Sequence, residues 1–359
     1  MSGVKERLLS ICCLGYCHAN YISDAIRSIR DIDYDRIEVV VVDDGSSDNS
    51  VALLEEFSGA VPFKMTVVAQ SNTGNVGLNF NNAYRRSVGD LVAFISLDDV
   101  YNSSVMLKQI EMMNADPGLA FVASSKTVSI DNDGYVTTKA AQLPLYSQPV
   151  GGVEGLLELE YSELGSFYIQ SAVFRREVID AVGAFDEDMT GDDIVLRTKI
   201  FRYLQDNPGY RFEILRENSF FYRLHGSNVH RNFPRQVRIV TEYLGRYWAG
   251  RRNPKLLVDW TCAYVSDNPF DDCVELFSMN GRAAALLSED RIRRCLRKSL
   301  AGEVGFFRRL QRMVYSRVKL GEGKRKVVLL GFFVFEYSKA RKKSASRRRE
   351  SLIHHTNYK

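Results

Sequence analysis

The chain has 359 residues, of which 45% are hydrophobic and 26% charged, the balance of an ordinary globular protein with about two domains. These values exclude a disordered chain, a collagen-like repeat and a small disulfide-stapled protein, and no apolar run approaches the roughly 18 residues of a membrane-spanning helix. The net charge of +4 hides an asymmetry, because residues 291–349 carry a balance of +17 and the rest of the chain a balance of −13.

Near-continuous apolar runs in the first third predict strands that are buried on both faces, at Leu8–Leu14, Glu38–Val42, Lys64–Ala69, Leu91–Leu97 and Leu119–Ser124. Apolar residues at helical spacing predict amphipathic helices between these strands, at Tyr21–Ile29, Val51–Phe57, Phe80–Ser87 and Met106–Met113. This alternating order predicts an α/β, doubly wound fold with a mostly parallel sheet. In such a sheet the ligand lies beyond the carboxyl ends of the strands.

The rest of the chain is first irregular and then helical. Residues from about 125 to 165 are rich in turns, and a short helix is predicted at Arg176–Val182. Further helices are predicted at Val237–Trp248, Lys255–Val265, Val274–Leu287 and Arg291–Leu300. We therefore divide the chain into a body at 1–233, with parts 1–125 and 126–233, a helical C-terminal region at 234–320 and a basic tail at 321–359.

Two pairs of adjacent acids follow the second and fourth predicted strands. These are Asp43 with Asp44, and Asp98 with Asp99. Turn formation or helix capping would explain one acid of each pair. It does not explain two like charges at the end of a central strand, where their repulsion costs energy, so we expect a ligand at this edge. Mg²⁺ and Mn²⁺ prefer oxygen ligands and usually bridge to phosphates, which makes a divalent cation the expected occupant.

Other motifs of nucleotide and metal chemistry are absent from the sequence. There is no GxxxxGK[ST] loop, no GxGxxG turn and no HExxH helix. Cys13 and Cys17 have no second cysteine pair at zinc-binding spacing, so zinc is not expected. The six cysteines are expected to be reduced thiols, which favours a cytoplasmic location.

Several motifs also occur in a recognisable order. The first half contains Leu9–Ile22, Val40–Asp48, Asn72–Gly74, Asn81, Gly89–Asp90 and Phe94–Asp99. Downstream come Phe174–Arg176, Gly183–Glu187, Gly191–Leu196 and Tyr222–Asn228. As an ordered set over about residues 7–232, these motifs resemble the inverting, nucleotide-sugar-dependent glycosyltransferases of family 2, which have the GT-A fold.

The resemblance implies a role for particular residues. It implies nucleotide binding by Leu14, Tyr16, Asp43, Asp44, Asn72, Asn81 and Ser96. It implies Mg²⁺ or Mn²⁺ binding by Asp98 and His225, catalysis by Asp193 as the base that deprotonates the acceptor, and support from Asp192, Asp99 and Arg223. The family usually has an acid where this chain has Ser96, so we expect weaker metal binding.

The implied reaction is a metal-dependent, inverting transfer from a UDP- or dTDP-sugar to a glycan or a polyprenyl-linked glycan, such as an O-antigen or capsule unit. Acceptor-binding residues are expected at about 150–175. Two alternatives stay open. One is a sugar-phosphate nucleotidyltransferase, which also uses a parallel sheet, acids and Mg²⁺, and the other is a nucleotide-sugar-binding module without catalysis.

The basic tail contains a nine-residue apolar run, Val327–Phe335, which is too short to cross a bilayer. Lys324, Arg325 and Lys326 precede the run, and more basic residues follow it. This pattern predicts peripheral attachment to an anionic membrane surface. The alternative is a buried helix with a solvated basic end. No nucleic-acid-binding fold is recognisable, so nucleic acid is not an expected partner.

Overall fold

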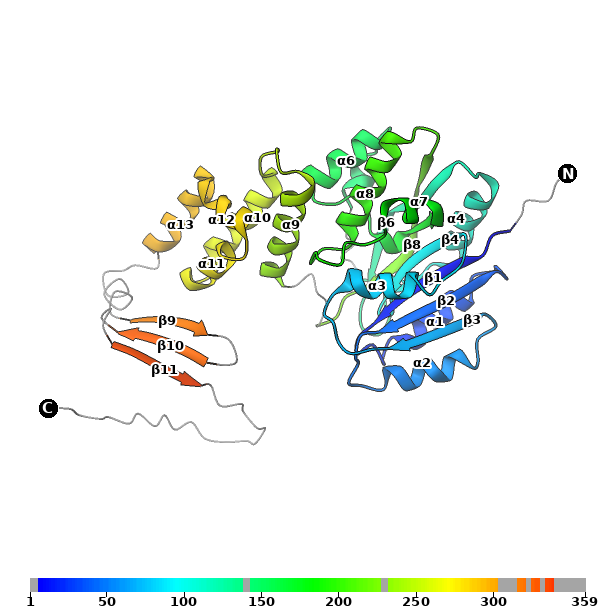
Figure 1. Ribbon diagram of the computed structural model, residues 1–359, viewed down its shortest axis with the longest axis horizontal. Coiled ribbons are helices and arrows are strands. Elements are labelled where there is room, and N and C mark those ends of the chain that lie inside the picture. Colours follow the sequence, from blue (N-terminus) through cyan, green and yellow to red (C-terminus); the bar gives the residue numbers. More distant parts are fainter. Residues whose placement is uncertain are drawn as a thin grey trace.

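The structure is a computed structural model that describes residues 6–137, 143–226, 232–302, 315–320, 324–329 and 333–338. Its main body is an eight-stranded sheet with the order β3-β2-β1-β4-β7-β6-β8-β5 (Figure 1). The strands are β1 Leu9–Gly15, β2 Ile37–Asp43, β3 Lys64–Ala69, β4 Leu91–Ser96, β5 Val100–Tyr101, β6 Leu119–Ile130, β7 Ala172–Arg175 and β8 Arg211–Arg223.

The pairing of these strands confirms a mostly parallel α/β sheet. Strands β3, β2, β1 and β4 run parallel, and β6 is parallel to β8. β7 is antiparallel to both β4 and β6, and β5 is antiparallel to β8. The carboxyl ends of β1, β2 and β4 therefore meet at one edge, where the two pairs of acids were expected.

Helices cover both faces of the sheet. They are α1 Ile22–Arg30, α2 Ser50–Ser58, α3 Val76–Tyr84, α4 Ser103–Ala115, α5 Pro144–Ser147, α6 Val153–Ser162, α7 Arg176–Val182 and α8 Asp193–Asp206, with a short 3-10 turn at Ile169–Ser171. Side chains alternate across each strand, so Ile11 and Cys13 of β1 belong to the core that includes residues of α1, α2 and α4. Cys12 and Leu14 belong to the core on the other face, which includes residues of α3, α6, α7 and α8. Both faces of β1 are buried, as its apolar run predicts.

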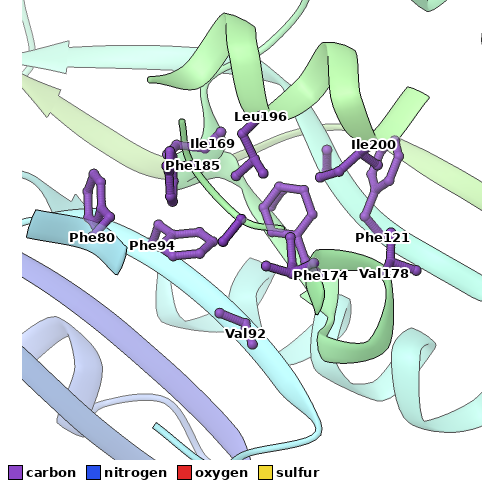
Figure 2. Close-up of a cluster of buried hydrophobic side chains, with 14 of the residues drawn as sticks. Phe80, Val92, Phe94, Phe121, Ile169, Phe174, Val178, Phe185, Leu196 and Ile200 are labelled. Carbon is purple, nitrogen blue, oxygen red and sulfur yellow. The ribbon is translucent and has the colours of Figure 1, made fainter. Parts of the chain in front are cut away.

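An aromatic cluster fixes the segment that leads into α8 (Figure 2). The ring of Phe185 lies edge-on to Phe94 of β4, with 5.1 Å between the centroids, and stacks on Phe80 of α3 at 5.5 Å. Phe174 of β7 lies between Phe94 and Phe121, at 6.2 and 5.9 Å. These contacts hold the chain that follows α7 against the sheet, and thereby set where α8 begins.

The C-terminal region is helical, as predicted, up to residue 302. Its helices are α9 Phe233–Tyr247, α10 Lys255–Asp267, α11 Phe270–Phe277, α12 Gly281–Ala285 and α13 Asp290–Gly302, with a 3-10 turn at Leu286–Ser288. The single helix predicted at Val274–Leu287 is wrong, because Asn280 starts a new helix by accepting a hydrogen bond from the backbone N–H of Ala283 at 2.8 Å. α9, α10 and α13 share an apolar core with Ile194 and Val195 of α8.

Three strands, β9 Tyr315–Leu320, β10 Lys324–Leu329 and β11 Phe333–Ser338, form a separate antiparallel sheet. The prediction of a helical region up to residue 320 is therefore wrong for 315–320. The run Val327–Phe335 is divided between two strands, which also contradicts a buried helix there, and its Val and Phe residues favour strands. Within the described ranges no helix is long and apolar enough to cross a membrane. The boundaries at 125, 233 and 320 stay predictions, and residues 339–359 lie outside the described residues.

Candidate active site

A cleft of about 740 Å³ opens at the carboxyl ends of β1, β2 and β4, large enough for a small-molecule ligand. Most of the residues that the sequence proposed for a site line it together: Leu14, Tyr16, Asp44, Asn72, Ser96, Asp98, Asp99, Asp192, Asp193 and His225. These residues come from six separate parts of the chain. Asp43, Asn81 and Arg223 do not line the cleft.

Asp43 and Asp44 have different environments. Asp43 is fully buried, and its carboxylate accepts hydrogen bonds from the backbone N–H of Ser46 at 2.8 Å and from its hydroxyl at 2.5 Å. It therefore closes the turn after β2. The carboxylate of Asp44 accepts from the backbone N–H groups of Thr73 at 2.8 Å and Gly74 at 3.1 Å, and it also faces the cleft. Of the two acids, Asp44 is the one placed to meet a ligand.

The loop that carries Asn72 packs closely on this turn. Gly45 has a φ of +78°, and a Cβ there would lie 2.7 Å from the backbone nitrogen of Asn72, so only glycine fits. Asn81 has a structural position instead. Its side-chain amide donates to the carbonyl of Phe185 at 2.9 Å and accepts from the N–H of Phe185 at 3.0 Å. Asn81 thus ties α3 to the segment before α8.

Asp98 lies between two histidines. Its Oδ2 is 2.9 Å from Nε2 of His225, and its Oδ1 is 4.0 Å from Nδ1 of His18. Burial raises the pKa of Asp98, but the hydrogen bond with His225 and the nearby His18 outweigh it, so the pKa falls to about 2. Burial lowers the pKa of His18. The three side chains are buried or nearly so, and they face the same cleft.

This cluster fits a divalent cation. The candidate ligand atoms of His18, Asp98 and His225 all lie within 4.8 Å of one another. Within the described residues, Nδ1 of His18 and Oδ1 of Asp98 are buried without a hydrogen-bond partner, which a bound cation would satisfy. Sequence reasoning had proposed Asp98 and His225 and missed His18. The sequence did hold one indication that another ligand is needed, because Ser96 leaves one ligand position of the metal motif without an acid.

Arg223 supports the acidic pair from behind the cleft. Its guanidinium is fully buried and donates to the carbonyls of Asp98 at 2.8 Å, Asp131 at 3.0 Å and Asn132 at 2.8 Å. Its backbone N–H donates to the carboxylate of Asp99 at 2.9 Å. Burial and the charge of Asp98 raise the pKa of Asp99 well above its usual range. Arg223 is therefore a positioning residue for the loop that carries Asp98.

Asp192 and Asp193 lie at the start of α8, on another wall of the cleft. The carboxylate of Asp193 accepts from the backbone N–H of Ile169 at 3.3 Å and from Arg197 at 3.5 Å. Burial and the neighbouring charge of Asp192 raise the pKa of Asp193 to about 7, although Arg197 opposes the shift. Burial also raises the pKa of Asp192. A carboxylate with such a pKa can accept a proton near neutral pH.

The wall of the cleft around Asp193 includes residues that the sequence analysis indicated only as a range, about 150–175. Residues 163–168 and Gln170 fall inside the stretch expected to contact the acceptor. Leu164 has a positive φ of 57°, which is uncommon for a residue with a side chain. Arg235 and Gln236 of α9 and Trp260 of α10 were not foreseen, because the resemblance ended before these helices. The C-terminal helices therefore complete the cleft.

Comparisons with known proteins agree with this architecture. The family described as Glycosyl transferase family 2 matches residues 10–183. The chain is 27% identical over 226 residues to the uncharacterized glycosyltransferase alr2836 of Nostoc sp., which covers 62% of this chain and 66% of that protein. It is 23% identical over 188 residues to the poly-beta-1,6-N-acetyl-D-glucosamine synthase of Staphylococcus epidermidis, covering 52% of this chain and 43% of the synthase. The chain thus spans less than two thirds of the length of these relatives.

A crystal structure of residues 1–349 of TarS from S. aureus, in complex with UDP-GlcNAc, has a similar fold. Its TM-score is 0.51 at 13% identity, and the alignment covers 92% of this chain and 100% of that one. At this identity the similarity concerns the fold alone. The family match shows that residues 10–183 are a glycosyl transferase family 2 domain. The structural similarity shows that the fold is GT-A-like.

Proposed function

We propose that this chain transfers a sugar from a nucleotide-sugar donor to an acceptor hydroxyl, with inversion at the anomeric carbon and with the help of a divalent cation. The observation that carries the proposal is the shared cleft. Asp44, the pair of Asp98 and His225, and Asp193 with its raised pKa all face it. A donor-binding carboxylate, a cation site at the diphosphate and a base for the acceptor are the parts that this reaction needs.

The nucleoside would lie against Tyr16, Asp44 and Asn72. Asp44 already accepts hydrogen bonds from the loop at Thr73 and Gly74, but an ionised carboxylate has about four lone-pair sites and can accept more from a base or ribose. Asp98 and His225 would hold the divalent cation. That cation, once bound, would neutralise the charge that builds up on the departing diphosphate.

Asp193 would act as the base. The acceptor oxygen forms a bond with the anomeric carbon while the bond from that carbon to the diphosphate breaks, and the hydroxyl proton moves to the carboxylate of Asp193. Attack from the face opposite the leaving group inverts the configuration. Asp192 keeps the pKa of Asp193 raised through like-charge repulsion, and the N–H of Ile169 orients one carboxylate oxygen.

The donor we propose is a UDP- or dTDP-sugar, and the acceptor a growing glycan or a polyprenyl-linked glycan of a surface polysaccharide such as O-antigen or capsule. The printed names of two relatives support this class: a poly-beta-1,6-N-acetyl-D-glucosamine synthase and a putative teichuronic acid biosynthesis glycosyltransferase, to which the chain is 28% identical over 106 residues. We also propose that the protein works in the cytoplasm at the inner face of the membrane, attached through its basic tail.

The test is to incubate the full chain with a panel of nucleotide sugars, Mn²⁺ or Mg²⁺, and candidate glycan acceptors. Release of a nucleoside diphosphate with formation of an inverted glycoside supports the proposal. Formation of pyrophosphate from a sugar phosphate and a nucleoside triphosphate would indicate a nucleotidyltransferase instead. Donor binding in a thermal-shift assay without turnover, across the panel, would indicate a binding module.

A further inference from the structure

His18 lies in the loop between β1 and α1 and faces the pair formed by Asp98 and His225. We propose that His18 is a third protein ligand of the divalent cation, which makes the site a set of two histidines and one carboxylate. We further propose that this set binds Mn²⁺, Co²⁺ or Fe²⁺ in preference to Mg²⁺. The inference rests on the cation position in the proposed function and adds its ligand set and its selectivity.

The first argument is the geometry of the unpaired atoms. Nδ1 of His18 and Oδ1 of Asp98 are 4.0 Å apart, and neither has a hydrogen-bond partner in the part of the chain that is described. Asp98 is only 8% exposed, so its free oxygen costs energy unless something binds it. Two ligands of one ion that each bind it at about 2.1 Å lie on the order of 3 Å apart. A cation would therefore need to draw these two atoms together by about 1 Å.

The second argument is that the loop carrying His18 is held rigidly on the turn after β2. The backbone N–H of His18 donates to the hydroxyl of Ser50 at 3.0 Å. On either side, the N–H of Cys17 donates to the hydroxyl of Ser46 at 2.7 Å and the N–H of Ala19 to the carboxylate of Asp48 at 3.1 Å. Such anchoring keeps the imidazole in place before the cation arrives, which is what a ligand needs.

The third argument concerns the carboxylate that this chain lacks at Ser96. Ser96 stands where the resemblance expects the first acid of the metal motif, so that position offers a hydroxyl and no carboxylate. His18, whose Nδ1 lies 4.0 Å from Oδ1 of Asp98, supplies a nitrogen instead. Imidazole is a softer ligand than carboxylate, so an imidazole in place of a carboxylate favours a first-row transition-metal ion over Mg²⁺. Two neutral histidines also leave more positive charge on the ion for an anionic diphosphate.

The experiment measures metal binding on the full-length protein without donor or acceptor. Mn²⁺ binding is followed by electron paramagnetic resonance of the free ion and by calorimetry, and Mg²⁺ competes in the same titration. We expect His18→Ala to weaken Mn²⁺ binding by at least about tenfold, since loss of an outer contact to a metal ligand alone costs 10–100-fold. His18→Asp should keep Mn²⁺ binding and improve competition by Mg²⁺, because it restores an oxygen ligand.

Cys17→Ser is the matched control, because Cys17 is the neighbouring residue and its sulfur faces Ser47 at 3.7 Å and not Asp98. It should bind Mn²⁺ as the wild type does, and circular dichroism checks the fold of each variant. The inference is overturned if the wild type binds no Mn²⁺, if Mg²⁺ binds as tightly as Mn²⁺, or if His18→Ala binds Mn²⁺ within twofold of the wild type. Tight Mn²⁺ binding through His18 without release of nucleoside diphosphate from any donor would leave the inference standing and reject the proposed function.

Discussion

Arg197 shares one guanidinium between Glu160 and Asp193. It binds the carboxylate of Glu160 with two hydrogen bonds of 2.7 and 3.1 Å and lies 3.5 Å from Asp193. The side chains of Arg197 and Glu160 are 4% and 0% exposed, so neither charge is screened by water. Glu160 therefore holds the guanidinium of Arg197, whose charge would otherwise neutralise that of Asp193. The charge of Glu160 itself also helps to raise the pKa of Asp193.

The first prediction follows from this sharing. In Glu160→Gln, Arg197 loses its charged partner and turns more fully to Asp193, so the pKa of Asp193 should fall and the acidic limb of the kcat profile should move to lower pH. Breaking a buried ion pair should also lower the free energy of unfolding by about 3–5 kcal/mol. Urea denaturation and a pH series of turnover measure the two effects.

Glu158→Gln is the control for that variant. Glu158 lies on the same helix, α6, but it pairs with Arg251 on the surface at 3.0 Å, where the two side chains are 55% and 43% exposed. An exposed pair contributes little, so stability should change by less than about 1 kcal/mol and the pH profile should not move. Equal effects of the two variants would contradict the role given to Glu160.

The second prediction concerns Asp193→Asn. The variant cannot accept the acceptor proton, so kcat should fall by on the order of 10²–10⁴ while donor binding stays close to that of the wild type. Equilibrium dialysis with a nucleotide sugar and single-turnover assays measure the two quantities. Near-normal turnover would reject Asp193 as the base.

The third prediction is the pH dependence of turnover. A base with a pKa raised to about 7 loses its ionised form as the pH falls through neutrality, so kcat should decline below about pH 7. A solvated aspartate would keep its charge down to about pH 4. A profile that stays flat from pH 8 to pH 5 would contradict the raised pKa of Asp193.

The same pKa gives a fourth prediction, on stability. The folded pKa of Asp193 lies above the unfolded value, so its ionisation costs stability as the pH rises from about 4 to about 7. Asp193→Asn removes this cost and should raise the free energy of unfolding at pH 8 by up to about 4 kcal/mol, since the shift is about three pKa units at about 1.4 kcal/mol each. The difference should vanish near pH 3, below both pKa values, where the carboxyl is protonated in both states. Urea denaturation at the two pH values checks this.

The sequence predicted the parts of this protein that depend on local pattern. The buried strands and the acidic strand ends follow from apolar runs and from the rule that parallel strands end at one edge. It could not separate Asp43 from Asp44, because either acid could have closed the turn. His18 was missed because its approach to Asp98, 80 residues away along the chain, depends on the packing of β1 beside β4.

The sequence alone also could not show that the C-terminal helices line part of the cleft. Apolar spacing located α9 and α10, but no pattern indicated that Arg235 and Trp260 would line the same cleft as Asp193. That placement follows from the apolar core that α9 and α10 share with Ile194 and Val195 at the start of α8. Packing between elements far apart in sequence decides it.

The fifth prediction concerns the basic tail. Full-length protein should sediment with vesicles that contain anionic lipid at low salt and should be released at high salt, since each cation near the surface contributes about 1 kcal/mol. Replacing Lys324, Arg325 and Lys326 by glutamate should weaken this binding by at least tenfold. Turnover on a water-soluble acceptor analogue should stay unchanged, because such an acceptor does not have to be reached at a membrane surface.

A truncation gives the complementary test, and the strand pairing decides where to cut. Removal of residues after 320 would leave β9 without β10, its partner in the antiparallel sheet, and an unpaired strand is prone to aggregate. A cut after Gly302 follows α13 and removes all three strands together. The shortened protein should lose vesicle binding and keep turnover on the soluble analogue. If the full-length protein fails to sediment with anionic vesicles at low salt, or if the glutamate variant binds them equally well, attachment through the basic tail is rejected.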